Sequence, residues 1–316
     1  MNKLPIKLMP AFKDYLWGGT KLKTAYNKKS ELDIVAESWE LSTHKDGQSI
    51  VCGGEFDGLT LTQYIDKNGK DCIGKNAQKF DYFPILIKFI DALNNLSIQV
   101  HPDDEYALRV EGEYGKTEMW YILECDEGAY LYYGVNREIS KDEFRERIEN
   151  NTVLDVLNKV PVHKGDVFFI PAGTIHAICS GIVICEIQQN SNTTYRVYDY
   201  DRRDKNGNAR ELHIDKAIEV SSLVPSPEIK KADLSANDTV LAQCDKFTVR
   251  KLDVNSEMSV DITADCFHSL IITDGSGELT MDGKSFVLDK GDSFFIPAQD
   301  GKYTINGNCS VILSYV

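Results

Sequence analysis

Residues 164–172 read Lys-Gly-Asp-Val-Phe-Phe-Ile-Pro-Ala, and residues 290–298 read Lys-Gly-Asp-Ser-Phe-Phe-Ile-Pro-Ala. Eight of the nine positions are identical, although the two stretches lie 126 residues apart. Each stretch begins with a Gly-Asp turn, continues as a short apolar strand and ends at a proline, which has no backbone N–H to offer to a sheet. A match of this quality predicts that the chain contains two copies of one β-domain.

Short apolar runs bounded by turn residues surround both copies of the repeat. They are typical of β-strands and lie at 87–90, 96–100, 120–123 and 183–187 around the first copy, and at 269–272, 277–281 and 310–313 around the second. Asp282-Gly283 is the signal of a tight hairpin between two strands. The even spacing of short strands predicts a mainly β fold, built as a sandwich or a barrel of the jelly-roll kind.

Few helices are expected. Residues 140–143, Ser-Lys-Asp-Glu, form a capping box that predicts a helix running towards residue 159. A second, shorter helix is expected at 215–220.

The length of 316 residues suggests roughly two domains of ~150 residues each. Residues 223–238 contain two prolines and few large apolar side chains, which is typical of a linker. We therefore predict a larger domain at 1–225, a linker at about 226–237 and a smaller domain at 238–316.

Composition narrows the class of protein. The 35 basic and 49 acidic side chains give a formal net charge of −14, which disfavours nucleic acid and anionic membranes as partners. No apolar run approaches the ~20 residues of a membrane span, and the N-terminus lacks the apolar core of a signal peptide. The eight cysteines are scattered without a Cys-x-x-Cys pair, which is typical of reduced thiols. We therefore expect a cytoplasmic enzyme or binding protein, either a monomer or a homodimer.

The candidate metal ligands all lie in the larger half. Gln99 and His101 are two residues apart at the end of a strand and so face the same way, Glu118 enters another strand, and His176 follows the repeated strand. Two imidazoles, one carboxylate and one amide oxygen form a donor set suited to zinc or a similar divalent ion. The second copy has Gln-Asp-Gly at 299–301, with no histidine at the corresponding place. We therefore interpret the first copy as the active site and the second as a degenerate, structural partner.

Several motifs follow one another along the chain. They are Tyr-Leu-Trp-Gly-Gly at 15–19, Ala-Glu-Ser-Trp-Glu-Leu at 36–41, Gln-Val-His-Pro-Asp at 99–103, Lys-Thr-Glu-Met-Trp at 116–120, Pro-Ala-Gly-Thr-Ile-His-Ala at 171–177 and Asn-Thr-Thr-Tyr-Arg at 192–196. Together they resemble the type I mannose-6-phosphate isomerases (phosphomannose isomerases) of the cupin superfamily, in their compact bacterial form. The resemblance covers nearly the whole chain and implies two cupin-type jelly-roll barrels with a few short helices.

The resemblance also implies roles for individual residues. Gln99, His101, Glu118 and His176 would be the ligands of one Zn²⁺ per chain, and Arg196 would be the active-site arginine. The implied substrate is a small sugar phosphate, because the family interconverts mannose 6-phosphate and fructose 6-phosphate. In that reaction a proton moves between C2 and C1 through an enediol-type intermediate, and a divalent ion stabilises the negative charge that develops on the adjacent oxygen.

Two cationic side chains are candidates for the chemistry. Lys116 is a candidate base, because it lies two residues from Glu118 and faces the same way if the segment is extended; a divalent ion nearby would favour its neutral amine. The alternative for Lys116 is an ordinary surface lysine. Arg196 could bind the phosphate or stabilise the enediolate. The alternative for Arg196 is a structural salt bridge with Asp199 or Asp201.

The N-terminal motif Trp17-Gly18-Gly19 is the candidate substrate-binding segment. Its glycines could let backbone amides approach a phosphate or a sugar. The alternative is a tight turn that carries a packed tryptophan.

Two other function classes compete with the isomerase. Another metal-dependent cupin enzyme, such as an iron-dependent dioxygenase or a different sugar-phosphate isomerase, usually takes its ligands from a His-x-His pair plus Glu and His. The Gln99-x-His101 pair fits that pattern less well. A non-catalytic sugar-binding or regulatory cupin predicts eroded ligands in both copies of the repeat, whereas only the second copy lacks its histidine.

Overall fold

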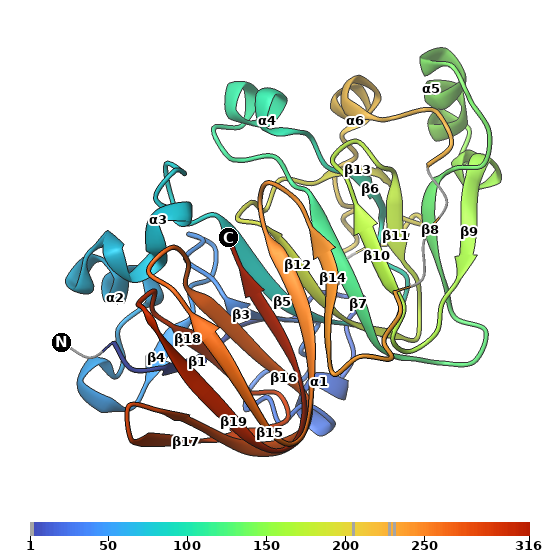
Figure 1. Cartoon of the computed structure of the whole chain (residues 1–316). Helices are drawn as coiled ribbons and strands as arrows, with labels where there is room; N and C mark the ends of the chain where they lie inside the picture. The colour runs from blue at the N-terminus through green and yellow to red at the C-terminus, as the bar shows by residue number, and fades with distance from the viewer. Residues whose placement is uncertain (1–2, 204–205, 227–228, 230–231) are drawn as a thin grey trace.

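The computed structural model describes residues 3–203, 206–226, 229 and 232–316, and the fold is mainly β (Figure 1). The strands within these residues form three sheets. An eight-stranded sheet has the order β14 (Asp238–Gln243), β15 (Thr248–Ile262), β19 (Gly301–Tyr315), β16 (His268–Met281), β18 (Ser293–Ile296), β1 (Ile6–Met9) and β4 (Ile50–Cys52), with β17 (Lys284–Asp289) paired to β16. A six-stranded sheet has the order β10 (Val167–Ile170), β7 (Glu118–Cys125), β12 (Ile182–Gln189), β5 (Ile85–Ala92), β3 (Glu37–Leu41) and β2 (Ala11–Lys13). A five-stranded sheet has the order β13 (Tyr195–Tyr198), β6 (Ile98–Val100), β11 (His176–Ile178), β8 (Tyr130–Val135) and β9 (Leu157–Pro161).

The helices are short. The described residues contain α1 (Lys21–Thr24), α2 (Leu61–Asn68), α3 (Gly74–Ala77), α4 (Asp104–Val110), α5 (Lys141–Glu149) and α6 (Ile214–Val220), with 3₁₀ turns at Gly54–Phe56, Lys70–Ile73 and Val153–Val156. The helix predicted from residue 140 begins as expected, since the Ser140 hydroxyl accepts the Glu143 N–H at 3.1 Å. Its predicted extent towards residue 159 is wrong, because Asn151 adopts a left-handed φ of 56° after α5 and ends the helix. The shorter helix predicted at 215–220 is confirmed as α6.

Both copies of the repeat form the predicted turn and strand. Gly165 and Gly291 hold the turns with φ of 90° and 92°, and β10 and β18 follow them. The hairpin signal Asp282-Gly283 is confirmed between β16 and β17, where both residues have a positive φ, as a tight two-residue turn requires. All eight cysteines are free thiols, as predicted.

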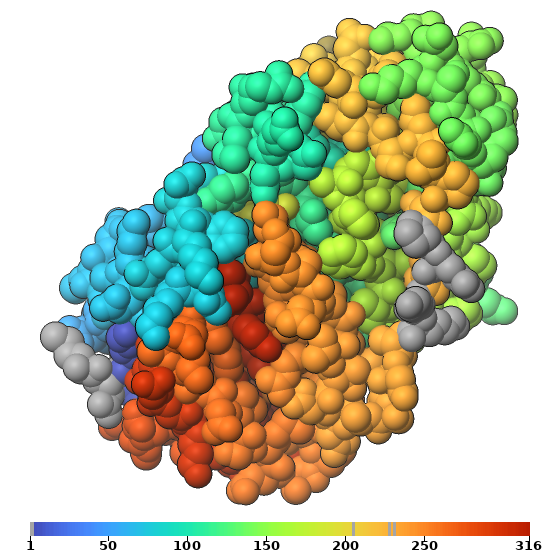
Figure 2. Space-filling model, turned by 45° about the horizontal axis from the view of Figure 1, so that its top comes forward, coloured from blue at the N-terminus to red at the C-terminus, as the bar shows by residue number. Residues whose placement is uncertain are grey.

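The N-terminal strands join the sheet of the C-terminal half. β1 pairs with β18 on one side and with β4 on the other (Figure 1), so this sheet crosses the predicted division between 1–225 and 238–316. Figure 2 shows the cyan α2–α3 region lying against the orange C-terminal half, where the Asn76 N–H donates to the Asp265 carbonyl at 2.9 Å. The predicted linker at 226–237 falls partly outside the described residues.

The turn of the second copy of the repeat packs against the first half. Lys28 is buried, with its ammonium 2.7 Å from the Glu40 carboxylate, and it also donates to the carbonyl of Gly291. The side chain of Ser293, two residues further on, donates to the Glu40 carbonyl at 3.0 Å. Buried partners of this kind are costly to separate, so the contact holds the two halves in a fixed relation.

The six- and five-stranded sheets share one hydrophobic core. Ile90, Trp120 and Ile184 from the first sheet pack in the same buried cluster as Leu131 and Ile178 from the second. A face of each sheet is therefore turned towards the other. Among the described residues, the helices are too short or too polar to cross a membrane.

The turn at Gly291 gives a test of this packing. A Cβ at Gly291 would lie 1.9 Å from the Tyr26 carbonyl oxygen, whereas nothing lies within 4 Å of a Cβ at Gly283, which also has a positive φ. We expect Gly283→Ala to lower the free energy of unfolding by ~1 kcal/mol through backbone strain alone. Gly291→Ala should lower it by at least ~3 kcal/mol, because the clash adds to the strain. Urea denaturation of both variants measures the difference, and equal losses would contradict the packing described here.

Candidate metal centre

Three neighbouring strands place charged side chains on the face between the two sheets. On β7, Met119 and Tyr121 enter the core on the outer face of the six-stranded sheet, while Trp120 enters the core between the sheets. Since strand residues alternate between faces, Glu118 points inwards with Trp120. The same alternation turns Lys88 of β5 and Glu186 of β12 inwards, and these two residues pair directly across the strands.

The five-stranded sheet supplies the opposite wall. Gln99 on β6 pairs with His176 on β11 and with Arg196 on β13. The residues beside them, among them Val100 and Tyr195, pack into the core behind this sheet. The alternation therefore turns Gln99, His176 and Arg196 towards the six-stranded sheet.

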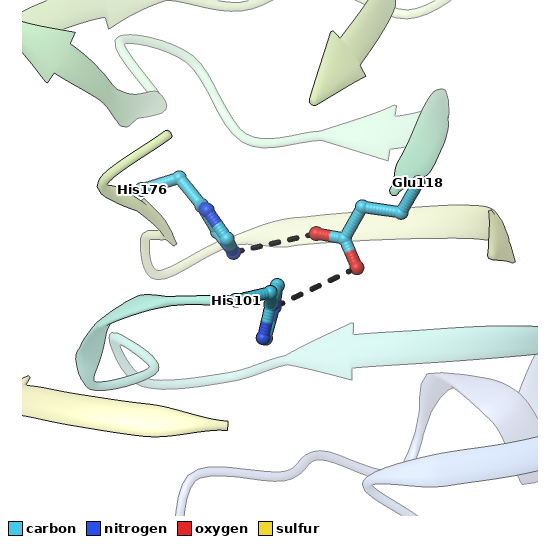
Figure 3. A group of neighbouring side chains, drawn as sticks. All are labelled: His101, Glu118 and His176. Atoms are coloured by element: carbon cyan, nitrogen blue, oxygen red, sulfur yellow. Dashed lines mark ion pairs between the residues drawn. The ribbon is translucent and has the colours of Figure 1, made fainter. Parts of the chain in front are cut away.

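Three of the four predicted ligands converge on one point. His101 lies directly after β6, and the ligand atoms of His101, Glu118 and His176 all lie within 4.8 Å of one another (Figure 3). The Nε2 atoms of His176 and His101 lie 3.3 Å and 3.7 Å from the two oxygens of Glu118. The Gln99 side-chain amide adjoins the group, 3.4 Å from His176 Nε2. Exchange of its nearly indistinguishable O and N atoms turns the carbonyl oxygen to the same place.

Both imidazoles are held with a lone pair facing Glu118. His101 Nδ1 lies 2.9 Å from the Thr193 carbonyl, and His176 Nδ1 lies 2.9 Å from the Thr174 carbonyl. A carbonyl can only accept a hydrogen bond, so each Nδ1 carries the proton and each Nε2 keeps its lone pair. Burial lowers the pKa of His176 to about 4 and that of His101 well below its usual value, so both rings are neutral near pH 7. Metal-bound histidines are oriented in this way.

The Glu118 carboxylate is buried with a single cationic neighbour among the described residues, the Lys116 ammonium 2.8 Å from Oε2. Its side chain is wholly buried, and neither oxygen accepts a hydrogen bond of normal geometry. Burial, followed by the charge of Glu186, raises the pKa of Glu118. A buried carboxylate is costly when its oxygens lack hydrogen bonds, and a divalent cation between it and the two imidazole lone pairs would lower that cost. The donor set therefore fits a zinc-like ion.

Lys116 lies against the same atoms. Its ammonium is 2.8 Å from Glu118 Oε2, 3.2 Å from His101 Nε2 and 4.0 Å from Glu186 Oε1. The prediction that Lys116 faces the same way as Glu118 is confirmed. The alternative of a surface lysine is wrong, since only 4% of the residue is exposed.

A polar cavity of about 230 Å³ opens beside this group. Its walls include Trp17, Lys88, Gln99, Lys116 and Arg196, so both sheets and the N-terminal segment contribute. A cavity of about 430 Å³ next to His44 is larger, but it contains none of the predicted ligands. The smaller cavity is therefore the one positioned for chemistry at the histidines and Glu118.

Arg196 does not form the salt bridge with Asp199 that the alternative interpretation predicts. Asp199 instead binds Arg202 and Arg210. Arg196 donates from Nη1 to the Glu211 carbonyl at 2.8 Å, and its buried Nε has no partner. The guanidinium thus retains an unused donor at the wall of the cavity.

The N-terminal motif Trp17-Gly18-Gly19 forms a tight turn, as the alternative interpretation predicts. The Gly18 N–H donates to the Tyr15 carbonyl at 2.9 Å, and the Gly19 N–H donates to the Asp91 carbonyl at 3.3 Å. Both amides are therefore already paired within the protein. Trp17 is buried and its side chain lines the cavity.

Sequence reasoning missed the charged pair behind the ligands. Lys88 lies 3.4 Å from Glu186 Oε1 and 3.7 Å from Glu37 Oε2, and the Trp120 indole donates to Glu186 at 2.9 Å. Although burial alone would lower it, the two carboxylates raise the pKa of Lys88. The signal was present, since Lys88 and Glu186 are single charges inside otherwise apolar strands that the sequence identifies.

Comparisons with known proteins agree over the whole chain. The catalytic domain of type I phosphomannose isomerases matches residues 6–128, and the cupin domain of mannose-6-phosphate isomerases matches residues 237–316. The probable mannose-6-phosphate isomerase GmuF of Bacillus subtilis is 39% identical over 98% of this chain and 99% of its own. The mannose-6-phosphate isomerase of Streptococcus mutans is 36% identical over 98% of each chain. The crystal structure of the Bacillus subtilis mannose 6-phosphate isomerase has a TM-score of 0.90 at 37% identity, covering 99% of each chain.

Metal binding tests the geometry directly. We expect the chelated chain to bind one equivalent of Zn²⁺ in a calorimetric titration, and His176→Ala to bind it at least ~100-fold more weakly, because one of the converging donors is lost. His163→Ala is the matched control, since the side chain of His163 is 70% exposed. Equal affinities of the native chain and His176→Ala would exclude this site.

Proposed function

Because this chain belongs to the type I mannose-6-phosphate isomerase family, we propose that it is a zinc-dependent isomerase that interconverts mannose 6-phosphate and fructose 6-phosphate. One observation carries the proposal: a wholly buried carboxylate, Glu118, faces two imidazole lone pairs beside a cationic cavity. Aldose–ketose isomerisation needs a charge-stabilising centre and a base on one face of an open-chain sugar. The arrangement supplies both.

Four residues would hold the metal. His101, Glu118 and His176 contribute the converging atoms, and the adjoining amide of Gln99 completes an N/O set. One Zn²⁺ bound there supplies a Lewis acid that stabilises negative charge on the substrate oxygen at C1 or C2. The hydrogen bonds from His101 and His176 to backbone carbonyls keep both rings in the orientation that this role requires.

Lys116 is the proposed base. Its Nζ lies beside Glu118 and His101, within reach of a substrate carbon placed against the ligand group. In this role the Lys116 amine takes the proton from C2 and returns it to C1. The hydroxyl proton passes from the C2 oxygen to the C1 oxygen, so the reaction is neutral in electrons and needs no organic cofactor.

Arg196 is proposed to stabilise the enediolate. It lies directly across from Gln99 in the sheet, and its buried Nε has no partner. A fixed guanidinium aimed at a charge that develops during the reaction lowers the barrier, because it need not reorganise. Trp17 would form a wall of the substrate site, held there by the turn at Gly18 and Gly19.

The proposal also covers the domain architecture, the location in the cell, the oligomeric state and the number of metal ions. We infer that the chain forms two cupin-type jelly-roll barrels, a larger one within residues 1–225 and a smaller one from 238–316 to which β1 and β4 are added, and that only the first carries a metal. The chain would act in the cytoplasm as a monomer or homodimer. The second copy of the repeat, which has no histidine after its strand, accounts for a single Zn²⁺ per chain.

The first test is a coupled assay of mannose 6-phosphate conversion. We expect activity that chelation abolishes and Zn²⁺ restores, because the charge-stabilising centre depends on the ion. His176→Ala should be inactive in the same assay, and His163→Ala should retain full activity. A folded, zinc-loaded chain that converts neither mannose 6-phosphate nor a related aldose phosphate would refute the proposed function.

The role of Lys116 has its own test. Lys116→Met should reduce kcat by ~10³-fold, the usual contribution of a positioned base, while one equivalent of Zn²⁺ still binds. Lys164→Met, on an exposed residue, is the control. Solvent-proton exchange at C2 of the substrate, followed by NMR, should be lost in Lys116→Met together with turnover. If the variant still exchanged that proton at the native rate, another group would be the base.

A further inference from the structure

We propose that Arg210, held in place by Asp199, binds the phosphate of the substrate and so sets the preference for phosphorylated over unphosphorylated sugars. This inference rests on the proposed function, and it assigns a residue that lies outside every motif of the sequence. The reasons are the geometry of Asp199, the unused donors of Arg210 and the balance of charge at this end of the cavity.

Asp199 is a buried carboxylate that fixes two arginines. It follows β13 and is only 6% exposed. The Arg210 Nε and Nη2 atoms donate to its two oxygens at 2.8 Å and 2.6 Å, which is the forked arrangement of a strong arginine–carboxylate pair. Arg202 donates to the same carboxylate from the other side. Asp199 thereby fixes the plane and direction of the Arg210 guanidinium.

Arg202 and Arg210 differ in the hydrogen-bond donors that they leave unbonded. Each side-chain nitrogen of Arg202 donates within the protein, because Nε and Nη1 also donate to the carbonyls of Asp199 and Asn95. Arg210 makes no further bond through Nη1 among the described residues, and its side chain is 32% exposed and lines the cavity. One edge of Arg210 is therefore anchored, and the other faces the space where a substrate would lie.

The charges at this end of the cavity favour an anion. Arg202 and Arg210 bind Asp199, and Arg196 lies within the electrostatic reach of Asp199 and of the exposed Glu211, so three positive groups meet two negative ones, in a chain whose formal net charge is −14. Nearby guanidiniums repel one another, which lowers the pKa of the half-buried Arg196 in addition to the effect of its burial. A phosphate dianion would balance this excess and match the fork geometry of arginine. Neutral hydroxyl groups of a sugar would not.

Arg210 and Arg196 line the same cavity from different elements. Arg196 lies across from Gln99, beside the proposed metal ligands, whereas Arg210 comes from the loop between β13 and α6. A phosphate carried by C6 is remote from the reacting C1 and C2 atoms. An interaction with it is the same in the ground state and the transition state, so its loss raises KM and leaves kcat almost unchanged.

Steady-state kinetics with Arg210→Gln tests the assignment. We expect the KM for mannose 6-phosphate to rise ~10- to 100-fold with kcat within about twofold of the native value. Arg210→Lys should recover part of the loss, because it keeps the charge but not the fork. Asp199→Asn should raise KM in the same sense, since Asp199 acts as a positioning residue. Arg203→Gln, on an exposed residue of the same loop, should leave KM unchanged.

Binding of inorganic phosphate provides a readout that needs no turnover. Phosphate should raise the thermal midpoint of the native chain and of His176→Ala, but not that of Arg210→Gln, because only Arg210→Gln lacks the anion site. The midpoints without phosphate show whether each variant is folded, and Arg210→Lys replaces Arg210→Gln if the latter is not.

The outcomes distinguish this inference from the proposed function. Stabilisation by phosphate that depends on Arg210, in a chain that converts no aldose phosphate, would support the anion site and refute the isomerase. An active isomerase whose KM and phosphate stabilisation are unchanged in Arg210→Gln would overturn the inference alone. A fall in kcat at constant KM would also overturn it, because Arg210 would then act in the chemical step.

Discussion

The wholly buried Glu118 carboxylate is the constraint around which the rest of the site is arranged. A charged group in the interior must be paired, and the free energy that it otherwise costs exceeds what one ordinary hydrogen bond returns. Around Glu118 the chain places two imidazole lone pairs and the Lys116 ammonium, and no normal hydrogen bond. Lys116 is the one cation beside the carboxylate in the described part of the chain, while the two imidazole lone pairs bring no positive charge of their own. The electrostatics of the fold thus favour a cation between the three converging groups as much as the identity of the residues does.

Strand alternation is what allows a cluster of charges to exist inside a hydrophobic protein. On β5, β7 and β12, one set of side chains fills the outer core, and the other set carries Lys88, Glu118 and Glu186. Each of these charges is then met by a neighbour, as when the Trp120 indole donates to Glu186. The same tryptophan packs edge-on against His176, with ring centroids 5.3 Å apart. Packing and charge compensation therefore use the same side chain, and Trp120 holds both His176 and Glu186 in place.

The sequence predicts the local features well and the long-range ones poorly. The repeated turn and strand and the hairpin at Asp282-Gly283 depend on short patterns, and both appear in the structure. The convergence of His101, Glu118 and His176 is a long-range feature that was predicted from their donor chemistry and from the family resemblance, and it also appears. The pairing of β1 with β18 joins residues almost 300 positions apart, and no local pattern encodes it. The anchoring of Arg210 by Asp199 depends on how a loop folds back beside the cavity. The predicted helix overran its end because a single left-handed residue, Asn151, ends it.

The two copies of the repeat have the same turn and strand but make different contacts. In the first copy the strand leads to His176, whose ring completes the converging group. In the second copy the same turn offers the Gly291 carbonyl to the buried Lys28, and Ser293 stands where the first copy has Val167. The hydroxyl of Ser293 donates to the Glu40 carbonyl, a bond that valine could not make. The one difference within the nine residues therefore serves the contact between the halves. A strand that leads to the His176 cluster and a strand that joins the two halves can keep the same backbone, because glycine sets the turn geometry and the side chains adapt to what each strand faces.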